Sequence, residues 1–421
     1  MEFGVLANGC VRTALAFVAF SLCLAPPSAI AEKNGDTGQK ADFRIPVVPL
    51  GYSAPNSFYL LSRLSSVSLD FIDKDHLLFT FRVPGLMARL PECLPGDEDQ
   101  TIRAVVLELP EGKVITKTDW RMHDRSRYLW RLSDGRFLVR QRSTLFATDK
   151  SLELEQYIHS ESPLESIQIS PDRKFAVIEA QGKKQNRETV ASTVPTLGDA
   201  PPPESKPVQL FVLRTDTRAL IARSEMLNAI EIPMLGEGHV QSIAGKQNKW
   251  LVRYMPFQGG ETQTLLELDS ACHPSEEPVS KDVTLVMTCP RSGNDHLITA
   301  LSLDGKKLWE QRWESRYIWP TFQLTQDGSR FAYSSLQVAH PVGTMDPVDT
   351  ENITHQMVGV FDTQTGQLRL VKDATPILSA GQNYALSSDG MRFAILREGA
   401  IEIFNLPPIT APVTPESAGA H

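Results

Sequence analysis

The chain has 421 residues, in which 50 Asp and Glu outnumber 42 Lys and Arg to give a formal net charge of −8. This mildly acidic balance, without a basic tract, excludes an electrostatic case for binding nucleic acid or an anionic membrane surface. The length is sufficient for one large repeat domain or for two ordinary domains.

The first 31 residues predict a secretory signal peptide. Arg12 ends a short amino-terminal region, and residues 13–25 form an apolar stretch that is too short to span a bilayer. Ala29-Ile30-Ala31 then supplies the small residues of a cleavage site, with a buried or anchoring helix as the alternative interpretation. We therefore expect a secreted or periplasmic protein without a membrane span, cleaved near Ala31, in which residues 32–57 form a linker.

One short phrase recurs downstream: a polar strand end, an Asp-Gly-like turn, and an apolar strand led by an aromatic residue. Clear copies cover residues 132–139, 169–177, 324–333 and 386–395. Repetition on this scale indicates one structural unit built several times. If degenerate copies are included, the turn is placed seven times, about 52 residues apart on average, at Asp75, Asp134, Asp172, Asn248, Asp295, Asp327 and Asp389.

Short strands joined by tight turns are predicted between these anchors, and no long stretch has the apolar period of a helix. In the first repeat the strands cover residues 67–71, 77–81, 103–109 and 113–117, and in the sixth 321–325, 330–335, 357–361 and 367–371. In the last repeat they cover residues 384–387, 392–397 and 400–405. Residues 58–63 are expected to add a fourth strand there and so to join the two ends of the chain.

The predicted fold class is all-β: a seven-bladed β-propeller of four-stranded antiparallel blades over residues 58–405, with six or eight blades as alternatives. Two stretches lengthen the repeats: one from Gln181 to Pro207, which carries five prolines and no aromatic residue, and one from Val342 to Gln356, in which Asp and Thr recur beside a proline. Both are predicted to be surface insertions, and residues 406–421 are predicted to be a disordered tail.

The Ser-x-Asp-Gly-x-x-Phe/Leu-Ala/Leu hairpin and the Asp-x-x-Thr-Gly hairpin of the outer strands resemble those of secreted bacterial β-propellers of the WD-repeat-like and YVTN-like superfamily. The resemblance covers residues 62–405, although the chain lacks the Trp-Asp and Gly-His pairs of true WD repeats. It implies the propeller fold. It does not imply a function, because the superfamily includes binding proteins, scaffolds and enzymes.

Two similar five-residue segments provide the best candidate for a ligand site. Ser126-Arg127-Tyr128-Leu129-Trp130 matches Ser315-Arg316-Tyr317-Ile318-Trp319, and each segment leads into the innermost strand of a predicted blade. Arg offers a fork of donors for an anion, while Tyr and Trp offer faces for stacking. We expect a protein partner or an acidic, aromatic or sugar-like ligand at the mouth of the central channel, bound by Arg127, Tyr128, Trp130, Arg316, Tyr317 and Trp319. In the alternative interpretation the rings pack between blades and the arginines bond backbone carbonyls.

Three cysteines follow the predicted cleavage site. In an oxidising compartment Cys272 and Cys289 are the expected disulfide pair, and Cys93 is left free or paired between molecules. The histidines show no metal-binding spacing, so no metal site is predicted. The segment from Leu303 to Trp309 resembles the repeat of pyrroloquinoline-quinone propellers but occurs once. We therefore predict no cofactor and expect Trp309 to pack between blades.

The sequence favours a non-catalytic binding or protein-interaction module. The alternative is a propeller-fold enzyme, such as a lactonase or another hydrolase, with a metal-assisted site in the channel. Three or more carboxylate or histidine side chains that meet at the channel would favour the enzyme. The sequence contains neither a Gly-x-Ser-x-Gly elbow nor a Gly-rich phosphate loop.

Overall fold

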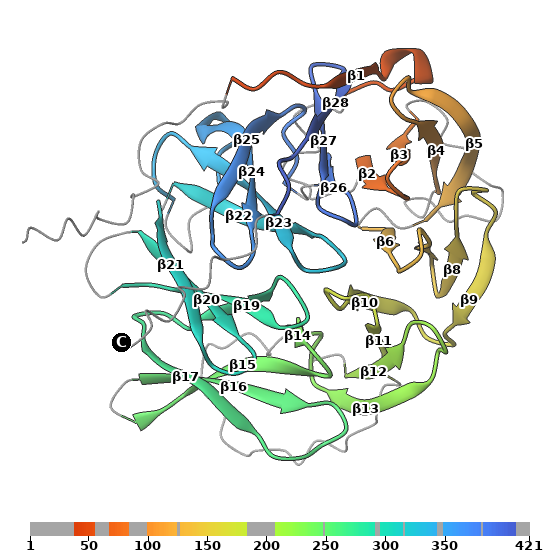
Figure 1. Ribbon diagram of the computed structural model, residues 1–421. Helices are drawn as coiled ribbons and strands as arrows, with labels where there is room; N and C mark the ends of the chain where they lie inside the picture. Colours follow the sequence, from red (N-terminus) through yellow and green to blue (C-terminus); the bar gives the residue numbers. More distant parts are fainter. Residues whose placement is uncertain are drawn as a thin grey trace, which may run out of the picture.

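The computed structural model describes residues 38–54, 67–83, 99–123, 127–182, 207–246, 249–290, 295–314, 316–342, 348–379 and 382–409. These residues form seven four-stranded antiparallel sheets, arranged radially around a central opening (Figure 1). The all-β fold predicted from the repeats, a seven-bladed β-propeller, is therefore confirmed. The predicted signal peptide, Cys93 and residues 410–421 of the predicted tail lie outside the described residues.

We number the blades in chain order. Blade one contains β2 (Val67–Phe71), β3 (His76–Arg82), β4 (Gln100–Glu108) and β5 (Lys113–Met122). Blade two contains β6 (Leu129–Arg131), β7 (Phe137–Gln141), β8 (Thr144–Thr148) and β9 (Glu155–His159). Blade three contains β10 (Leu164–Ile169), β11 (Phe175–Gln181), β12 (Val208–Arg214) and β13 (Leu220–Met226). Blade four contains β14 (Met234–Leu235), β15 (Gly238–Ala244), β16 (Lys249–Pro256) and β17 (Gln263–Asp269).

The later blades follow the same plan. Blade five contains β18 (Ser275–Pro278), β19 (Val283–Thr288), β20 (His296–Ser302) and β21 (Lys307–Trp313). Blade six contains β22 (Tyr317–Leu324), β23 (Arg330–Val338), β24 (Ile353–Asp362) and β25 (Leu368–Ala374). Blade seven contains β26 (Tyr384–Leu386), β27 (Arg392–Arg397), β28 (Ala400–Asn405) and β1 (Phe43–Pro46). Two single turns of 3-10 helix, Val48–Leu50 and Thr350–Asn352, complete the regular structure of the described residues.

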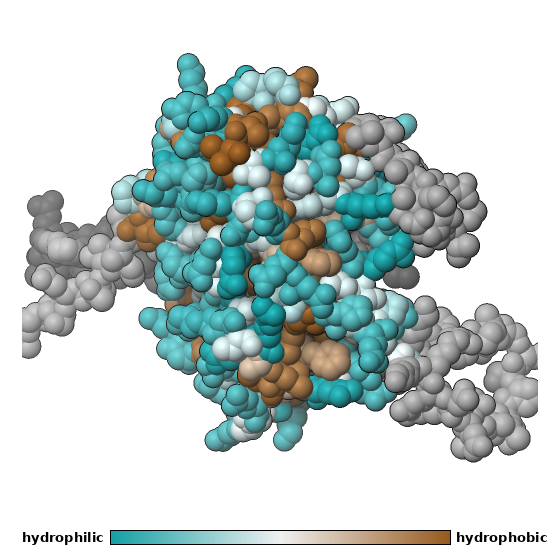
Figure 2. All heavy atoms as spheres, turned by 90° about the vertical axis from the view of Figure 1, so that its right-hand side faces the viewer, coloured by the Kyte–Doolittle hydropathy of each residue, from teal (hydrophilic) through white to brown (hydrophobic). Residues whose placement is uncertain are grey.

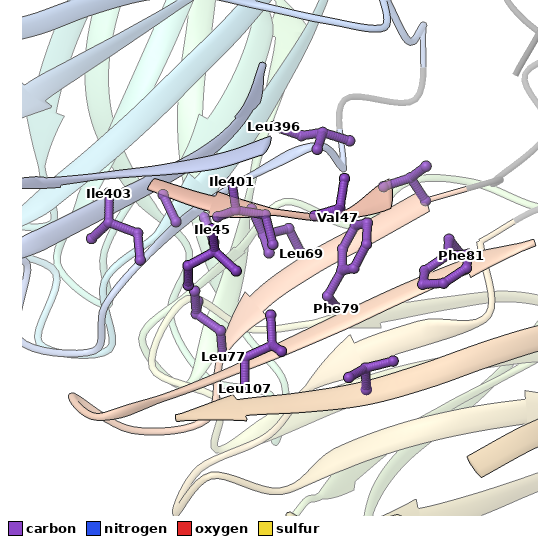
Figure 3. Close-up of a cluster of buried hydrophobic side chains, with 14 of the residues drawn as sticks. Ile45, Val47, Leu69, Leu77, Phe79, Phe81, Leu107, Leu396, Ile401 and Ile403 are labelled. Carbon is purple, nitrogen blue, oxygen red and sulfur yellow. The ribbon is translucent and has the colours of Figure 1, made fainter. Parts of the chain in front are cut away.

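The ring is closed by the amino-terminal segment, as expected, but with a different strand. β1 pairs with β28 in antiparallel register, with Phe43 opposite Ile403 and Ile45 opposite Ile401. This strand lies in the segment predicted to be a linker, and the predicted closing residues 58–63 lie outside the described residues. Ile45 and its neighbours also join blade seven to blade one in a buried apolar cluster (Figure 3). β1 therefore covers the open edge of blade seven and also adds an apolar side chain to the core between blades seven and one.

The Asp-Gly turns join the first two strands of their blades. The carboxylate of Asp327 accepts the backbone N–H of Ser329 at 3.0 Å, while Gly328 has a φ of +70°. Aspartate therefore satisfies the turn backbone and glycine adopts the left-handed conformation, as expected for a structural turn. The anchors of blades four and five were wrong, because Asn248 follows β15 and Asp295 follows β19. The first hairpins of these two blades do not carry the phrase.

Two predicted boundaries also shift. The second insertion is shorter than expected, because β24 already begins at Ile353. The propeller continues past Asn405, since Leu406 is 4 % exposed and donates its backbone N–H to the Met391 carbonyl at 2.8 Å. No helix in the described part of the chain is long and apolar enough to cross a bilayer.

The rim seen in Figure 2 is mainly hydrophilic and is interrupted by small apolar groups. Exposed apolar side chains of the outermost strands include Val114 and Ile115 on β5 and Leu220 on β13. Single exposed apolar residues are ordinary for a folded protein, and the larger apolar side chains lie between the blades.

Candidate functional site

The central channel is lined by the first strand of each blade. These inner strands all run in one direction, because each begins at the connection from the preceding blade and ends at the first hairpin turn. We call the two ends of the channel the mouth end, where the inner strands begin, and the turn end. A cavity of about 310 Å³ lies in the channel and is lined by residues of blades one to six.

Blades two and three give this cavity a basic wall, formed by Arg127, Arg131 and Arg173. Arg127 precedes β6 at the mouth end and its side chain is exposed. Its guanidinium carbon lies 5.6 Å from the ring centroid of Trp130, and its Nε donates to the Leu129 carbonyl at 3.1 Å. The other N–H groups of Arg127 make no hydrogen bond to the described residues, so they are available to a ligand.

Arg131 and Arg173 extend across the turn end of the channel. Arg131 donates to the Leu386 carbonyl of blade seven at 3.1 Å. Arg173 donates to Gln326 Oε1 of blade six at 3.2 Å. Both bonds reach blades that are not adjacent in the ring. They place two guanidinium groups at the floor of the cavity, as seen from the mouth end.

Asp70 on β2 is the acid of the basic wall. It is 8 % exposed, and its Oδ2 accepts a hydrogen bond from Ser68 Oγ at 3.0 Å. Burial raises the pKa of Asp70, and the positive charge of Arg131 is the largest opposing influence. Burial and the charge of Arg131 lower the pKa of Arg173 to about 9. Because three arginines face one aspartate, the wall keeps a net positive charge.

Blades four and five give the cavity an acid wall. Glu231 precedes β14, and Glu276 and Glu277 lie in β18. Ser242 Oγ donates to Glu276 Oε1. Burial and the negative charge of Glu231 raise the pKa of Glu277 to about 8. Among the described residues, no hydrogen bond or ion pair involves the Glu277 carboxyl group.

The structure places two of the six predicted ligand-binding residues at this cavity, namely Arg127 and Trp130. Tyr128 is fully buried in the cluster between blades one and two, and its hydroxyl lies 2.6 Å from Thr80 Oγ1. Tyr128 therefore packs between two blades, as the alternative interpretation of the sequence has it, and does not reach the cavity. Arg127 and Trp130 both belong to the first of the two similar segments, in blade two.

The second of the two similar segments, which contains Arg316, Tyr317 and Trp319, lies at a different cavity. Arg316 is exposed, whereas Tyr317 and Trp319 line a space of about 630 Å³ between blades five and six. Cys272 and Cys289, the pair expected from the sequence, are bonded at 2.07 Å beside this space. The two similar segments occupy equivalent places at the starts of inner strands, but they line different cavities and do not form one site.

Most charged residues of the channel cavity were missed by the sequence analysis: Asp70, Arg131, Arg173, Glu231, Glu276 and Glu277. One of them carried a local signal. Arg173 takes the place of glycine in the repeated turn and has a φ of +61°. A left-handed conformation costs a residue with a side chain about 1 kcal/mol. An arginine at this position therefore points to a role for its side chain.

Within the described ranges, no group of three or more His, Cys, Asp or Glu side chains is placed to hold a metal ion. The glutamates of the acid wall come from two blades. Their chemistry is that of separate carboxyl groups on a wall that opposes arginines.

Comparison with known proteins shows no family for this chain. No protein-family model and no curated protein matches the sequence. The chain is similar to the acylaminoacyl peptidase of Pyrococcus horikoshii, with a TM-score of 0.42 and 11 % identity over 76 % of this chain and 54 % of that one. This chain thus spans about half the length of the peptidase.

Two other solved structures are similar over most of their own length. An oligogalacturonate lyase in complex with manganese matches with a TM-score of 0.42 and 12 % identity, over 82 % of this chain and 97 % of that one. A putative TolB from Agrobacterium tumefaciens matches with a TM-score of 0.37 and 13 % identity, over 70 % and 95 %. Likeness at this level carries no argument about fold or function, and the propeller fold rests on the seven sheets of the structure itself.

Proposed function

We propose that this protein is a secreted or periplasmic binding module that holds a small anionic ligand in its central channel. The signal-like residues 1–31 and the Cys272–Cys289 disulfide support a location outside the cytoplasm. The observation that carries the ligand proposal is Arg127, whose unused donors lie beside a Trp ring on a wall of net positive charge. A carboxylate accepts two parallel hydrogen bonds from such a fork.

A thermal-shift measurement tests this proposal, because a ligand that binds the folded state raises its melting temperature. The probes are succinate, benzoate and glucuronate, which represent acidic, aromatic and sugar-like anions. We expect at least one to stabilise the wild-type protein and to lose this effect in Arg127→Gln. The matched control is Arg312→Gln, which changes an exposed arginine on the outer strand β21. Equal shifts in all three proteins, or no shift in any, would contradict the proposal.

One observation favours a second candidate function, that of a hydrolase. With a pKa raised to about 8, the Glu277 carboxyl group holds its proton at neutral pH and can act as a general acid. An enzyme of this kind would open a probe such as γ-butyrolactone, with or without added Zn²⁺ or Ca²⁺. Glu277→Gln would then abolish turnover while probe binding persists. Binding without turnover under all these conditions would leave the binding module as the function.

A further inference from the structure

The charged residues of the channel cavity are sorted by blade. Arg127 and Arg131 belong to blade two, whereas Glu276 and Glu277 belong to blade five. In a ring of seven, blades two and five face each other, since two blades separate them on one side and three on the other. Figure 1 shows β6 and β19, strands of these two blades, on opposite sides of the central opening. The cavity therefore has a basic wall and an acid wall across from it.

The two walls do not neutralise each other. Within the described residues, no ion pair joins an arginine of the basic wall to a glutamate of the acid wall. Asp70 lies in the electrostatic field of all three arginines. Glu277 is influenced by Glu231 and by burial, and none of the arginines offsets that influence. The basic wall therefore contains its own acid. On the acid wall, the charge of His273 acts on Glu276, but no cation among the described residues offsets the negative charge at Glu277.

We infer that the ligand of the channel is a zwitterion with a free carboxylate at one end and a free ammonium group at the other, as in a short linear peptide. This inference rests on the proposed function and adds the charge of the ligand's second end. The carboxylate accepts hydrogen bonds from Arg127. The ammonium group donates to the carboxylates of Glu231 and Glu277, and because a cation favours the ionised form, Glu277 releases its proton to the solvent when the ammonium group binds. Each end of the ligand then meets an opposite charge, which a singly charged ligand does not achieve. A cavity of about 310 Å³ is large enough for a small molecule of this kind.

Isothermal titration with three matched probes tests the inference at neutral pH. Trialanine carries both charges, N-acetyltrialanine keeps the carboxylate, and trialaninamide keeps the ammonium group. We expect trialanine to bind at least about tenfold more tightly than either blocked form, because each block removes a charge-assisted hydrogen bond. In Glu277→Gln the advantage of trialanine over N-acetyltrialanine should disappear. The matched control Glu267→Gln, on the exposed outer strand β17, should retain it.

The outcomes separate this inference from the proposal beneath it. Equal affinity for trialanine and N-acetyltrialanine overturns the zwitterion and leaves an anion-binding channel. Binding of succinate, benzoate or glucuronate without binding of trialanine also overturns the zwitterion and leaves an anion-binding channel. A failure of all six probes overturns the binding proposal as well. Tight binding of Ca²⁺ or Zn²⁺ that is lost in Glu277→Gln assigns the acid wall to a metal and also overturns the zwitterion.

Discussion

Arginines at one repeated position have different surroundings in neighbouring blades. Arg330 and Arg392 each precede the aromatic residue of the hairpin phrase, and each donates to a backbone carbonyl in the turn of the next blade. The side chain of Arg330 is fully buried and its Nε donates to Asp362 Oδ1 at 2.8 Å. The side chain of Arg392 is 28 % exposed. Burial decides how much each bond contributes, because a buried donor or acceptor cannot turn to water instead.

We therefore predict unequal losses when these two arginines are replaced by methionine. Arg330→Met should lower the free energy of unfolding by about 3 kcal/mol, since it leaves the buried Asp362 carboxylate and the carbonyl groups of Gly390 and Pro407 with fewer partners. Arg392→Met should lower it by less than about 1 kcal/mol, because the partners of a partly exposed arginine can bond to water instead. Urea denaturation followed by far-ultraviolet circular dichroism measures both values. Losses of equal size would contradict this account of burial.

Glu277 gives the stability a defined dependence on pH. Its folded-state pKa is raised from 4.5 to about 8, so between these pH values the folded protein holds a proton that the unfolded chain has released. The contribution of this group to stability is complete below pH 4.5 and is lost as the pH rises toward 8. We predict that the stability of the wild type falls relative to Glu277→Gln between pH 5 and pH 9. Urea denaturation at pH 5, 7 and 9 measures the difference, and a constant difference would contradict the prediction.

At the scale of elements, aromatic side chains on outer strands clamp blades one, two and five to the blade that follows each of them. Trp309 Nε1 on β21 donates to the Thr363 carbonyl of blade six at 2.8 Å. The Tyr157 hydroxyl on β9 donates to the Thr215 carbonyl of blade three at 2.6 Å. Trp120 on β5 makes the corresponding bond to blade two at 3.3 Å. In each case the acceptor lies in the last hairpin of the following blade, so Trp309 is the packing residue that the sequence predicts.

The clamp at Trp309 requires glycine at position 366. A Cβ atom there would lie 2.6 Å from Trp309 Cδ2, and the φ of Gly366 is +67°. We predict that Gly366→Ala lowers the free energy of unfolding by about 2–4 kcal/mol, from strain plus overpacking. The control is Gly259→Ala, which has a φ of +78° but nothing within 4 Å of the added atom. It should cost about 1 kcal/mol from strain alone, and similar losses in thermal denaturation would contradict the clamp.

The sequence predicts best those blades in which the polar turn of the first hairpin is clearly marked. All strands of blades one and six and three strands of blade seven agree with the prediction to within a few residues, because turn chemistry and apolar alternation are local. The fourth strand of blade seven, β1, differs from the predicted residues 58–63. In blades four and five the first hairpins turn at Gly236 and at residues 279–282, without the full phrase. The polar turns at Asn248 and Asp295, which the repeat spacing favours, belong to the second hairpins of these blades. Local sequence patterns identify a turn, but they do not show whether it belongs to the first or the second hairpin of its blade.

The whole molecule depends on the joining of its two ends. β1 supplies the outermost strand of blade seven, and Ile45 on this strand is 3 % exposed. We predict that Ile45→Ala lowers the free energy of unfolding by about 2–5 kcal/mol, because it opens a space in the cluster between blades seven and one. Val48→Ala, at a nearby side chain that is 66 % exposed, should change it by less than about 0.5 kcal/mol. Equal and small effects in denaturation would show that closure does not depend on this strand.

The channel cavity is a property of the closed ring. Arg127 and Trp130 could be found from the sequence because they share one short segment with a visible echo. Asp70 and Glu277 are separated by some 200 residues and meet the same cavity through the order of seven blades. No local pattern marks such residues, since their common surroundings arise from long-range closure. The fold is therefore more predictable here than the site.

The most direct test of this account is a crystal structure of the protein soaked with whichever of the anionic or tripeptide probes binds most tightly. The account predicts electron density for the probe inside the channel, with its carboxylate at the Arg127 guanidinium and its other end toward β18. Density in the cavity between blades five and six, or on the outer rim with an empty channel, would contradict it.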